Sequence, residues 1–300
     1  MRLLYLAATA ALTFASFTAS AHDDLRILFL SKSSGFEHST IKVADGKPSH
    51  TDQTLQQIAE KMGATLTVTK DASLINAENL KNYDVVIFYT TEDLMQPGAD
   101  GNPAMGPNGV EELRAWVQNG GGLMGFHCAS DTFHRGKTAE GADRNKYGDE
   151  SPYLDMLGGE FAGHGAQFHG TLRLVYPKHP TAANIPADWS IKDEWYYFKD
   201  IVGDNVHVIA LLDPLQERAK QEKYSGSSYP IIWCSDEGNG RVYYNGMGHR
   251  EEVWSDETFQ QVVVDGINWA SGHGITDAEP NLHLVAPELA KGDTVKKPKQ

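Results

Sequence analysis

The sequence predicts an α/β protein with a mainly parallel β-sheet, helices on both faces of that sheet, and an added antiparallel β region. In the first half of the chain, short apolar runs alternate with segments of helical periodicity, which is the pattern of consecutive βαβ units. One of these runs, Asp84–Tyr89 (DVVIFY), is almost wholly apolar, as in a strand that is buried on both faces. In the second half the runs alternate between apolar and polar residues or form a hairpin, which indicates antiparallel strands.

The first half contains four expected strands, at Arg26–Leu30, Thr65–Thr69, Asp84–Tyr89 and Leu123–Phe126. Three helical segments separate them, at Ser49–Met62, Asn76–Asn82 and Val110–Gln118. Ser49 or Thr51 is suited to begin the first helix because a hydroxyl can accept a hydrogen bond from the first turn. Three consecutive glycines at 120–122 end the third helix.

The second half is less regular. The expected elements are strands at Gln167–Tyr176 and Val206–Leu212, a hairpin of Pro230–Cys234 and Arg241–Tyr244 around the turn Asp236–Gly240, and a final helix at Glu257–Ala270. No linker separates two folding units, so we expect one domain from residue 22 to residue 272 and a polar C-terminal tail over 273–300.

The N-terminus has the pattern of a secretory signal peptide over residues 1–21. Arg2 precedes an apolar stretch from Leu3 to Phe17, and Ala19–Ala21 (ASA) is a small-x-small cleavage site. We therefore expect a mature chain that begins at His22, is periplasmic or secreted, and does not insert into the membrane after cleavage.

Charge and cysteine content exclude several classes of protein. The 300 residues carry a formal charge of −14, which argues against nucleic acid or an anionic membrane as the main partner. Two cysteines are too few for a disulfide framework or a Cys-rich zinc site. Cys128 and Cys234 could bridge in an oxidising compartment, but two buried thiols are the favoured interpretation. The sequence leaves open whether the chain forms a homodimer.

The positions of the histidines are the main functional signal. Of the 12 histidines, His38, His127 and His249 each follow an expected strand, and His164 lies in a glycine-rich segment. Ligands of open α/β sheets bind where the parallel strands end, so these side chains are expected to meet there. Imidazole transfers protons near neutral pH and, when neutral, binds transition metals.

Any single histidine can equally be a satisfied structural residue, and no specific metal motif such as HExxH occurs. Five histidines in linking or strand segments are interpreted as structural: His50, His179, His207, His273 and His283.

Five short motifs together resemble one known family: Gly35-Phe36-x-His38, Gly122-x-x-Gly125-Phe126-His127, Gly158-Gly159-x-Phe161-x-x-His164, Asp193-Glu194-x-Tyr196 and Gly246-x-Gly248-His249. In order and spacing they look like the trehalose-utilisation (ThuA-like) family over about Leu25–Ser271. The resemblance implies a flavodoxin-like, doubly wound fold related to class I glutamine amidotransferases.

The resemblance also shows a departure from the amidotransferases. His127 stands where their Gly-x-Cys turn carries the nucleophile, Cys128 is one position late, and His249 and Glu251 stand where their His and Glu partners lie. Because a histidine cannot replace a thiolate as acyl acceptor by the same chemistry, glutaminase activity is not expected.

The family implies carbohydrate metabolism, in pathways where a sugar is first oxidised to its 3-keto form. A 3-keto group acidifies the neighbouring C2–H, so that a base, an acid and a group that stabilises the enolate suffice to cleave the glycoside. We assign His127, His249 and Glu194 as catalytic, and a divalent metal, zinc first, to His38, His127, His164 and His249; no nucleotide cofactor is expected. The residues expected to bind a small carbohydrate substrate are Phe36, Trp195, Tyr196 and His134.

Three alternatives accompany this hypothesis. The chain could be a non-catalytic sugar-binding module on the same fold, or a scaffold for a soluble protein partner. The aromatic run that begins at Trp195 could be strand and core, and Glu194 could lie in a solvated turn.

Overall fold

The computed structural model describes residues 25–98, 101–199, 201, 205–212, 229–272 and 278–290. The expected leader, the mature N-terminus His22, His273 and most of the C-terminal tail lie outside these residues. Within the described part of the chain, no helix has the length and apolar character needed to cross a membrane.

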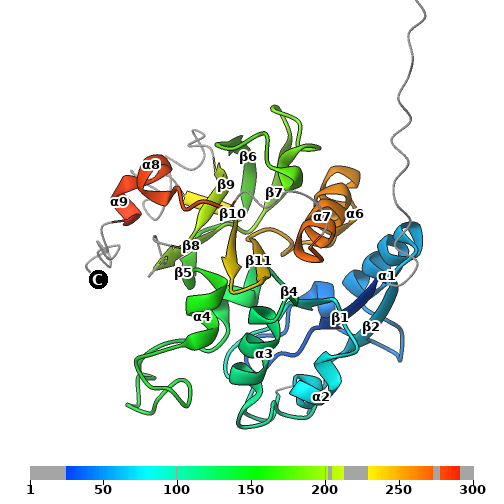
Figure 1. The fold of residues 1–300 in the computed structure, drawn as a ribbon, viewed down its shortest axis with the longest axis vertical. Helices are drawn as coiled ribbons and strands as arrows, with labels where there is room; N and C mark the ends of the chain where they lie inside the picture. Colours follow the sequence, from blue (N-terminus) through cyan, green and yellow to red (C-terminus); the bar gives the residue numbers. More distant parts are fainter. Residues whose placement is uncertain are drawn as a thin grey trace, which may run out of the picture.

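A nine-stranded mixed sheet forms the centre of the molecule, in the order β2-β1-β3-β4-β11-β10-β9-β6-β7 (Figure 1). The first five strands of this order run parallel: β2 (Thr65–Thr69), β1 (Arg26–Leu30), β3 (Val85–Phe88), β4 (Gly122–Phe126) and β11 (Gly240–Asn245). The other four pair antiparallel: β10 (Tyr229–Glu237), β9 (His207–Leu212), β6 (Phe168–Leu174) and β7 (Ser190–Asp193). The predicted fold class is thus confirmed.

The hairpin β10–β11 joins the two halves of the sheet. Its strands pair antiparallel with each other, while β11 also pairs in parallel with β4. The sequence predicts this hairpin but not that its second strand completes the parallel half. The strands β5 (Glu160–His164) and β7 were not predicted. β5 forms a separate two-stranded sheet with β8 (Tyr196–Lys199), which lies in the aromatic run for which a strand was the alternative interpretation.

Helices cover both faces of the parallel half, with α1, α6 and α7 on one side and α2, α3 and α4 on the other (Figure 1). Their bounds are α1 His50–Met62, α2 Ala77–Leu80, α3 Gly109–Gln118, α4 Pro152–Leu157, α6 Glu251–Ser255 and α7 Glu257–Ala270. Two short helices, α8 (Leu282–Val285) and α9 (Pro287–Ala290), follow near the C-terminus.

Local sequence explains how α1 begins and ends. The Ser49 hydroxyl accepts the Asp52 backbone N–H at 3.1 Å, and the Asp52 carboxylate accepts the Ser49 N–H at 2.8 Å. Ser49 rather than Thr51 is therefore the N-cap, in a reciprocal capping box. The helix ends at Gly63, whose φ of 70° suits glycine.

One hydrophobic core extends through both halves of the sheet. All four residues of β3 are buried, as expected for a strand covered on both faces. Cys128 and Cys234 are buried free thiols, so the interpretation of two thiols is confirmed and the bridge is absent.

Candidate functional site

Four side chains from four separate segments converge at the end of the parallel strands. His38 follows β1, His127 comes directly after β4, His249 follows β11, and Glu194 follows β7. Each contributes one nitrogen or oxygen to a group whose atoms all lie within 4.8 Å of one another. We call these four residues the donor group.

His127 is fixed by an unusual backbone turn. It begins the 3-10 helix η3 (His127–Asp131) with φ of 42°, a left-handed conformation that costs energy in any residue but glycine. Its ring is fully buried, and Nδ1 lies 3.2 Å from the Gly246 carbonyl oxygen. Because a carbonyl can only accept, Nδ1 is the hydrogen-bond donor in this contact. Nε2 lies 3.2 Å from His249 Nδ1, inside the donor group.

Glu194 is the anion of the donor group. Its Oε1 lies 3.2 Å from His249 Nδ1 and 3.7 Å from His127 Nε2, and its Oε2 lies 3.1 Å from His164 Nδ1. Burial would raise the pKa of Glu194, but the interactions with His127 and His249 outweigh burial and hold the pKa well below its usual range. The carboxylate is therefore ionised at neutral pH.

His38 supplies a buried ring with an unsatisfied nitrogen. Its ring centroid lies 5.1 Å from that of His127 and 5.2 Å from that of His249. Nδ1 has no hydrogen-bond partner among the described residues. Burial, followed by the neighbouring His127 and His249, holds the pKa of His38 well below its ordinary value, so this ring is neutral, as a metal ligand must be.

The turn before His249 is held from three directions. The Gly248 N–H donates to Asp193 Oδ2 at 2.7 Å. The Gly248 carbonyl accepts from Tyr89 Oη at 3.0 Å and from Trp254 Nε1 at 2.8 Å. Asp193 directly precedes Glu194, and Gly248 directly precedes His249. Their hydrogen bond therefore holds the backbone at Glu194 next to the backbone at His249. Neither Tyr89 nor Trp254 was predicted from the sequence, where the one signal was that Tyr89 ends an expected parallel strand.

The chemistry of the donor group suits a divalent transition metal. Ligands about 2.0–2.1 Å from a tetrahedral ion lie about 3.3 Å from one another. The separations of 3.2, 3.2 and 3.7 Å among His127 Nε2, His249 Nδ1 and Glu194 Oε1 are close to that value. His164 is outside the four-residue group, and 45% of its side chain is exposed.

The residues expected to bind sugar lie in different environments. Phe36 is 68% exposed, and its ring centroid is 5.0 Å from that of His38. Tyr196 is buried, with its ring centroid 4.0 Å from that of His127. Trp195 is fully buried and donates its indole N–H to the Phe168 carbonyl at 2.9 Å, so its expected role is corrected: it is a core residue, as the alternative interpretation had it. His134 is buried between Asp131 and Glu160, outside the donor group.

Three of the histidines interpreted as structural have local partners outside the donor group. His50 contacts the Ser255 hydroxyl at 3.0 Å, His179 the Thr181 hydroxyl at 2.8 Å, and His207 the Glu279 carbonyl at 2.7 Å. His283 lies in α8. Glu251, expected to stand near His249, is the first residue of α6 and is not in the donor group.

A comparison with protein families decides the membership of the chain. The model of the trehalose-utilisation family, ThuA, matches residues 26–270. The chain belongs to the ThuA family. In this ThuA protein, burial raises the pKa of the Cys128 thiol well above its ordinary value. Cys128, which directly follows His127, is therefore a poor nucleophile.

Solved structures share the ThuA fold. A ThuA-like protein of Bacteroides uniformis is 21% identical, with a TM-score of 0.61, over 86% of this chain and 95% of that one. A ThuA-like protein of Parabacteroides merdae is 16% identical, with a TM-score of 0.58, over 85% and 92%. A protein of Salmonella typhimurium LT2 described as cytoplasmic is 13% identical, with a TM-score of 0.53, over 82% and 99%. Among curated proteins, none matches the sequence.

Proposed function

We propose that this ThuA protein is an exported, metal-assisted enzyme that cleaves a 3-keto-glycoside. The observation that carries the proposal is the donor group, in which three histidines and an ionised carboxylate converge at the end of the parallel strands. The family supports a carbohydrate substrate, and the leader pattern of residues 1–21 supports export.

A divalent ion, zinc first, would be held by His38, His127, His249 and Glu194. When bound, it supplies a Lewis acid for the negative charge that develops on the keto oxygen. The low pKa of Glu194 suits a ligand and hydrogen-bond acceptor better than a general acid, because this carboxylate holds no proton at neutral pH. The role proposed for Glu194 is thus narrower than the catalytic role expected from the sequence.

His164 is the histidine best placed to move a proton to or from a substrate. Its Nδ1 lies 2.9 Å from the Gly165 carbonyl and 3.1 Å from Glu194 Oε2. Both oxygens accept, so the hydrogen lies on Nδ1 and the basic nitrogen is Nε2. Its half-exposed ring differs from the buried His127.

The reaction would proceed by proton transfer and elimination. A base, assigned to His164, removes the C2 proton, and the electron pair of that bond forms the enolate with the keto group. The keto group then re-forms, the electron pair of the C2–C3 enolate bond becomes a C1–C2 double bond, and the C1–O bond breaks. The departing oxygen takes up the proton that His164 removed. Water then adds to the unsaturated sugar, or the sugar is released as it is.

The test combines metal content with turnover. We expect the purified protein to carry about one divalent ion per chain, to release glucose from 3-keto-trehalose, and to lose both properties in Glu194→Gln. His164→Gln is expected to keep the metal and lose turnover by about 10²-fold or more. If the metal-loaded protein bound sugar without cleaving it, the result would instead support the non-catalytic sugar-binding module. If the metal-free protein kept full turnover, the proposed role of the metal would be refuted.

A further inference from the structure

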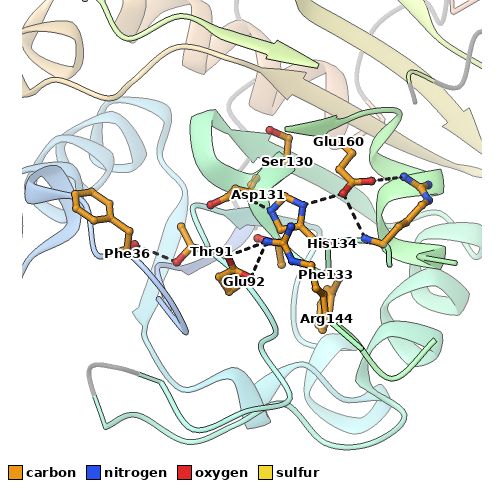
Figure 2. Close-up of polar contacts among 12 residues, drawn as sticks. Phe36, Thr91, Glu92, Ser130, Asp131, Phe133, His134, Arg144 and Glu160 are labelled. Atoms are coloured by element: carbon orange, nitrogen blue, oxygen red, sulfur yellow. Dashed lines mark hydrogen bonds and ion pairs between the residues drawn. The ribbon is translucent and has the colours of Figure 1, made fainter. Parts of the chain in front are cut away.

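A second polar cluster lies beside the donor group and shares its structural elements. Figure 2 shows Glu92, Asp131 and Arg144 gathered around His134, with Phe36 beyond Thr91. The loop after β1 carries both Phe36 and His38, and η3 carries both His127 and Asp131.

Hydrogen bonds to backbone carbonyls hold these elements together. Thr91 Oγ1 donates to the Phe36 carbonyl at 3.0 Å, and the Glu92 N–H donates to the Asp131 carbonyl at 2.7 Å. A Cβ atom at Gly35 would lie 2.5 Å from Glu92 Cγ, so the glycine allows the Glu92 side chain to pack against the loop that carries Phe36 and His38. The second cluster is therefore fixed on the same edge of the sheet.

The cluster has a buried back and an open front. At the back, His134 lies between Glu160 Oε1, at 2.8 Å, and Asp131 Oδ1, at 2.5 Å. Burial would lower the pKa of His134, but hydrogen bonds to Asp131 and Glu160 outweigh burial and raise it. At the front, the side chains of Glu92, Arg144 and Asp131 are 38%, 27% and 17% exposed. The partly exposed Asp131 carboxylate is thus held in place from behind.

The charges already paired in this cluster argue against a cation as its ligand. One Arg144 nitrogen lies 3.0 and 3.2 Å from the two Glu92 carboxylate oxygens. A metal ion would have to displace this guanidinium from Glu92 and the His134 ring from Asp131. A neutral ligand with several hydroxyls needs no displacement, because a guanidinium has five N–H donors and each carboxylate about four acceptor positions.

The exposed ring of Phe36 adds an apolar face beside the donor group, 5.0 Å from the His38 ring. Its loop is the one that Thr91 and Glu92 contact. A sugar ring presents C–H bonds on its faces, which suit an aromatic ring, and hydroxyls on its rim, which suit carboxylates and a guanidinium.

We propose that Phe36, Glu92, Asp131 and Arg144 form a second, polyhydroxyl-binding subsite that takes the leaving-group sugar of a glycoside whose reacting ring lies at the donor group. The inference rests on the proposed function and deepens it: the substrate is a disaccharide or a glycoside with a polyhydroxyl leaving group.

The kinetic test compares two substrates in matched variants. For each protein, kcat/KM is measured with 3-keto-trehalose and with methyl 3-keto-α-glucoside, which lacks the second ring, and the ratio of the two values is taken. Arg144→Ala and Glu92→Gln are expected to lower this ratio about tenfold. Arg173→Ala, which removes an exposed arginine on β6, is expected to leave the ratio as it is. A ratio that does not fall in the first two variants would overturn the subsite.

A binding test keeps the subsite separable from the chemistry. The dissociation constants of trehalose and of methyl α-glucoside are measured by calorimetry on the metal-loaded protein. We expect trehalose to bind more tightly than the methyl glucoside, and Arg144→Ala to weaken trehalose about tenfold. This result would support the subsite even if no keto-sugar were cleaved. Equal binding of both sugars, or no effect of Arg144→Ala, would contradict it.

Discussion

At the scale of single residues, Glu194 explains why three histidines can lie so close together. Its carboxylate faces His127, His249 and His164 within 3.7 Å, while His38 stays neutral because burial and its two histidine neighbours disfavour a further positive charge. Without Glu194, no carboxylate would remain in the donor group. Glu194 is therefore the negative charge on which the affinity of the donor group for a cation depends.

Glu160 gives a prediction about acid stability. It accepts from His134 at 2.8 Å and from Arg135 and Lys199 at 3.0 Å. Burial would raise its pKa, but His134 and Lys199 outweigh burial and lower the pKa from 4.5 to about 2. A carboxyl group with a lower pKa in the folded state contributes stability above its unfolded pKa and loses that contribution as the pH falls toward its folded pKa.

We therefore expect Glu160→Gln to cost about 3 kcal/mol of unfolding free energy at pH 7, and the cost to shrink as the pH falls from about 4.5 toward 2. Urea denaturation of both proteins at pH 7, 4.5 and 3 measures this difference. Glu60→Gln, an exposed change on α1, is the control, with an expected effect below about 0.5 kcal/mol at each pH. A cost for Glu160→Gln that does not depend on pH would contradict the assigned contacts.

At the scale of elements, the regular parts of the fold are legible in the sequence, whereas the turns that form the site are not. The strands Arg26–Leu30 and Thr65–Thr69 and the helix Glu257–Ala270 have the bounds that local periodicity predicts. The strands β5 and β8 are short and pair only with each other, so their local pattern is weak. Sequence places histidines at strand ends, but it does not show that the ring of Trp195 turns into the core, because that depends on packing between distant segments.

A substitution in the turn from Gly246 to His249 is predicted to weaken both stability and zinc binding. Gly248 has φ of 114°, and a Cβ there would lie 3.1 Å from Trp254 Nε1. Gly248→Ala is therefore strained in its backbone and crowded, at a cost of about 1–3 kcal/mol, and displaces His249. We expect lower thermal stability together with weaker binding of zinc in a competition assay with a chromophoric chelator.

Gly46→Ala separates the two effects. Gly46 also has a positive φ, of 68°, but a Cβ there would meet no atom within 4 Å. The control is expected to cost about 1 kcal/mol of stability and to leave zinc affinity as in the unmodified protein. Equal zinc affinity in Gly248→Ala and Gly46→Ala would show that the turn does not position His249.

At the scale of the whole molecule, the site depends on both halves of the sheet. His38 and His127 come from the parallel strands, whereas Glu194 follows β7 at the far antiparallel edge of the strand order. Asp193 bridges the halves, because its carboxylate accepts the N–H of Gly248 after β11. The sequence predicts each half separately, but their meeting at one site depends on the hairpin β10–β11, whose second strand pairs with β4.

A shared core predicts that the two halves unfold together. Buried side chains form one cluster across the sheet, and the buried thiols Cys128 and Cys234 lie on opposite sides of β11, at the end of β4 and in β10. We expect a single urea transition by far-ultraviolet circular dichroism and tryptophan fluorescence, with both thiols protected from a thiol reagent in the native state and exposed in that same transition. Because neither thiol is bridged, a reductant should not shift the midpoint. If one thiol reacted at lower urea than the other, the halves would be separate folding units, and the donor group could be lost before the parallel sheet unfolds.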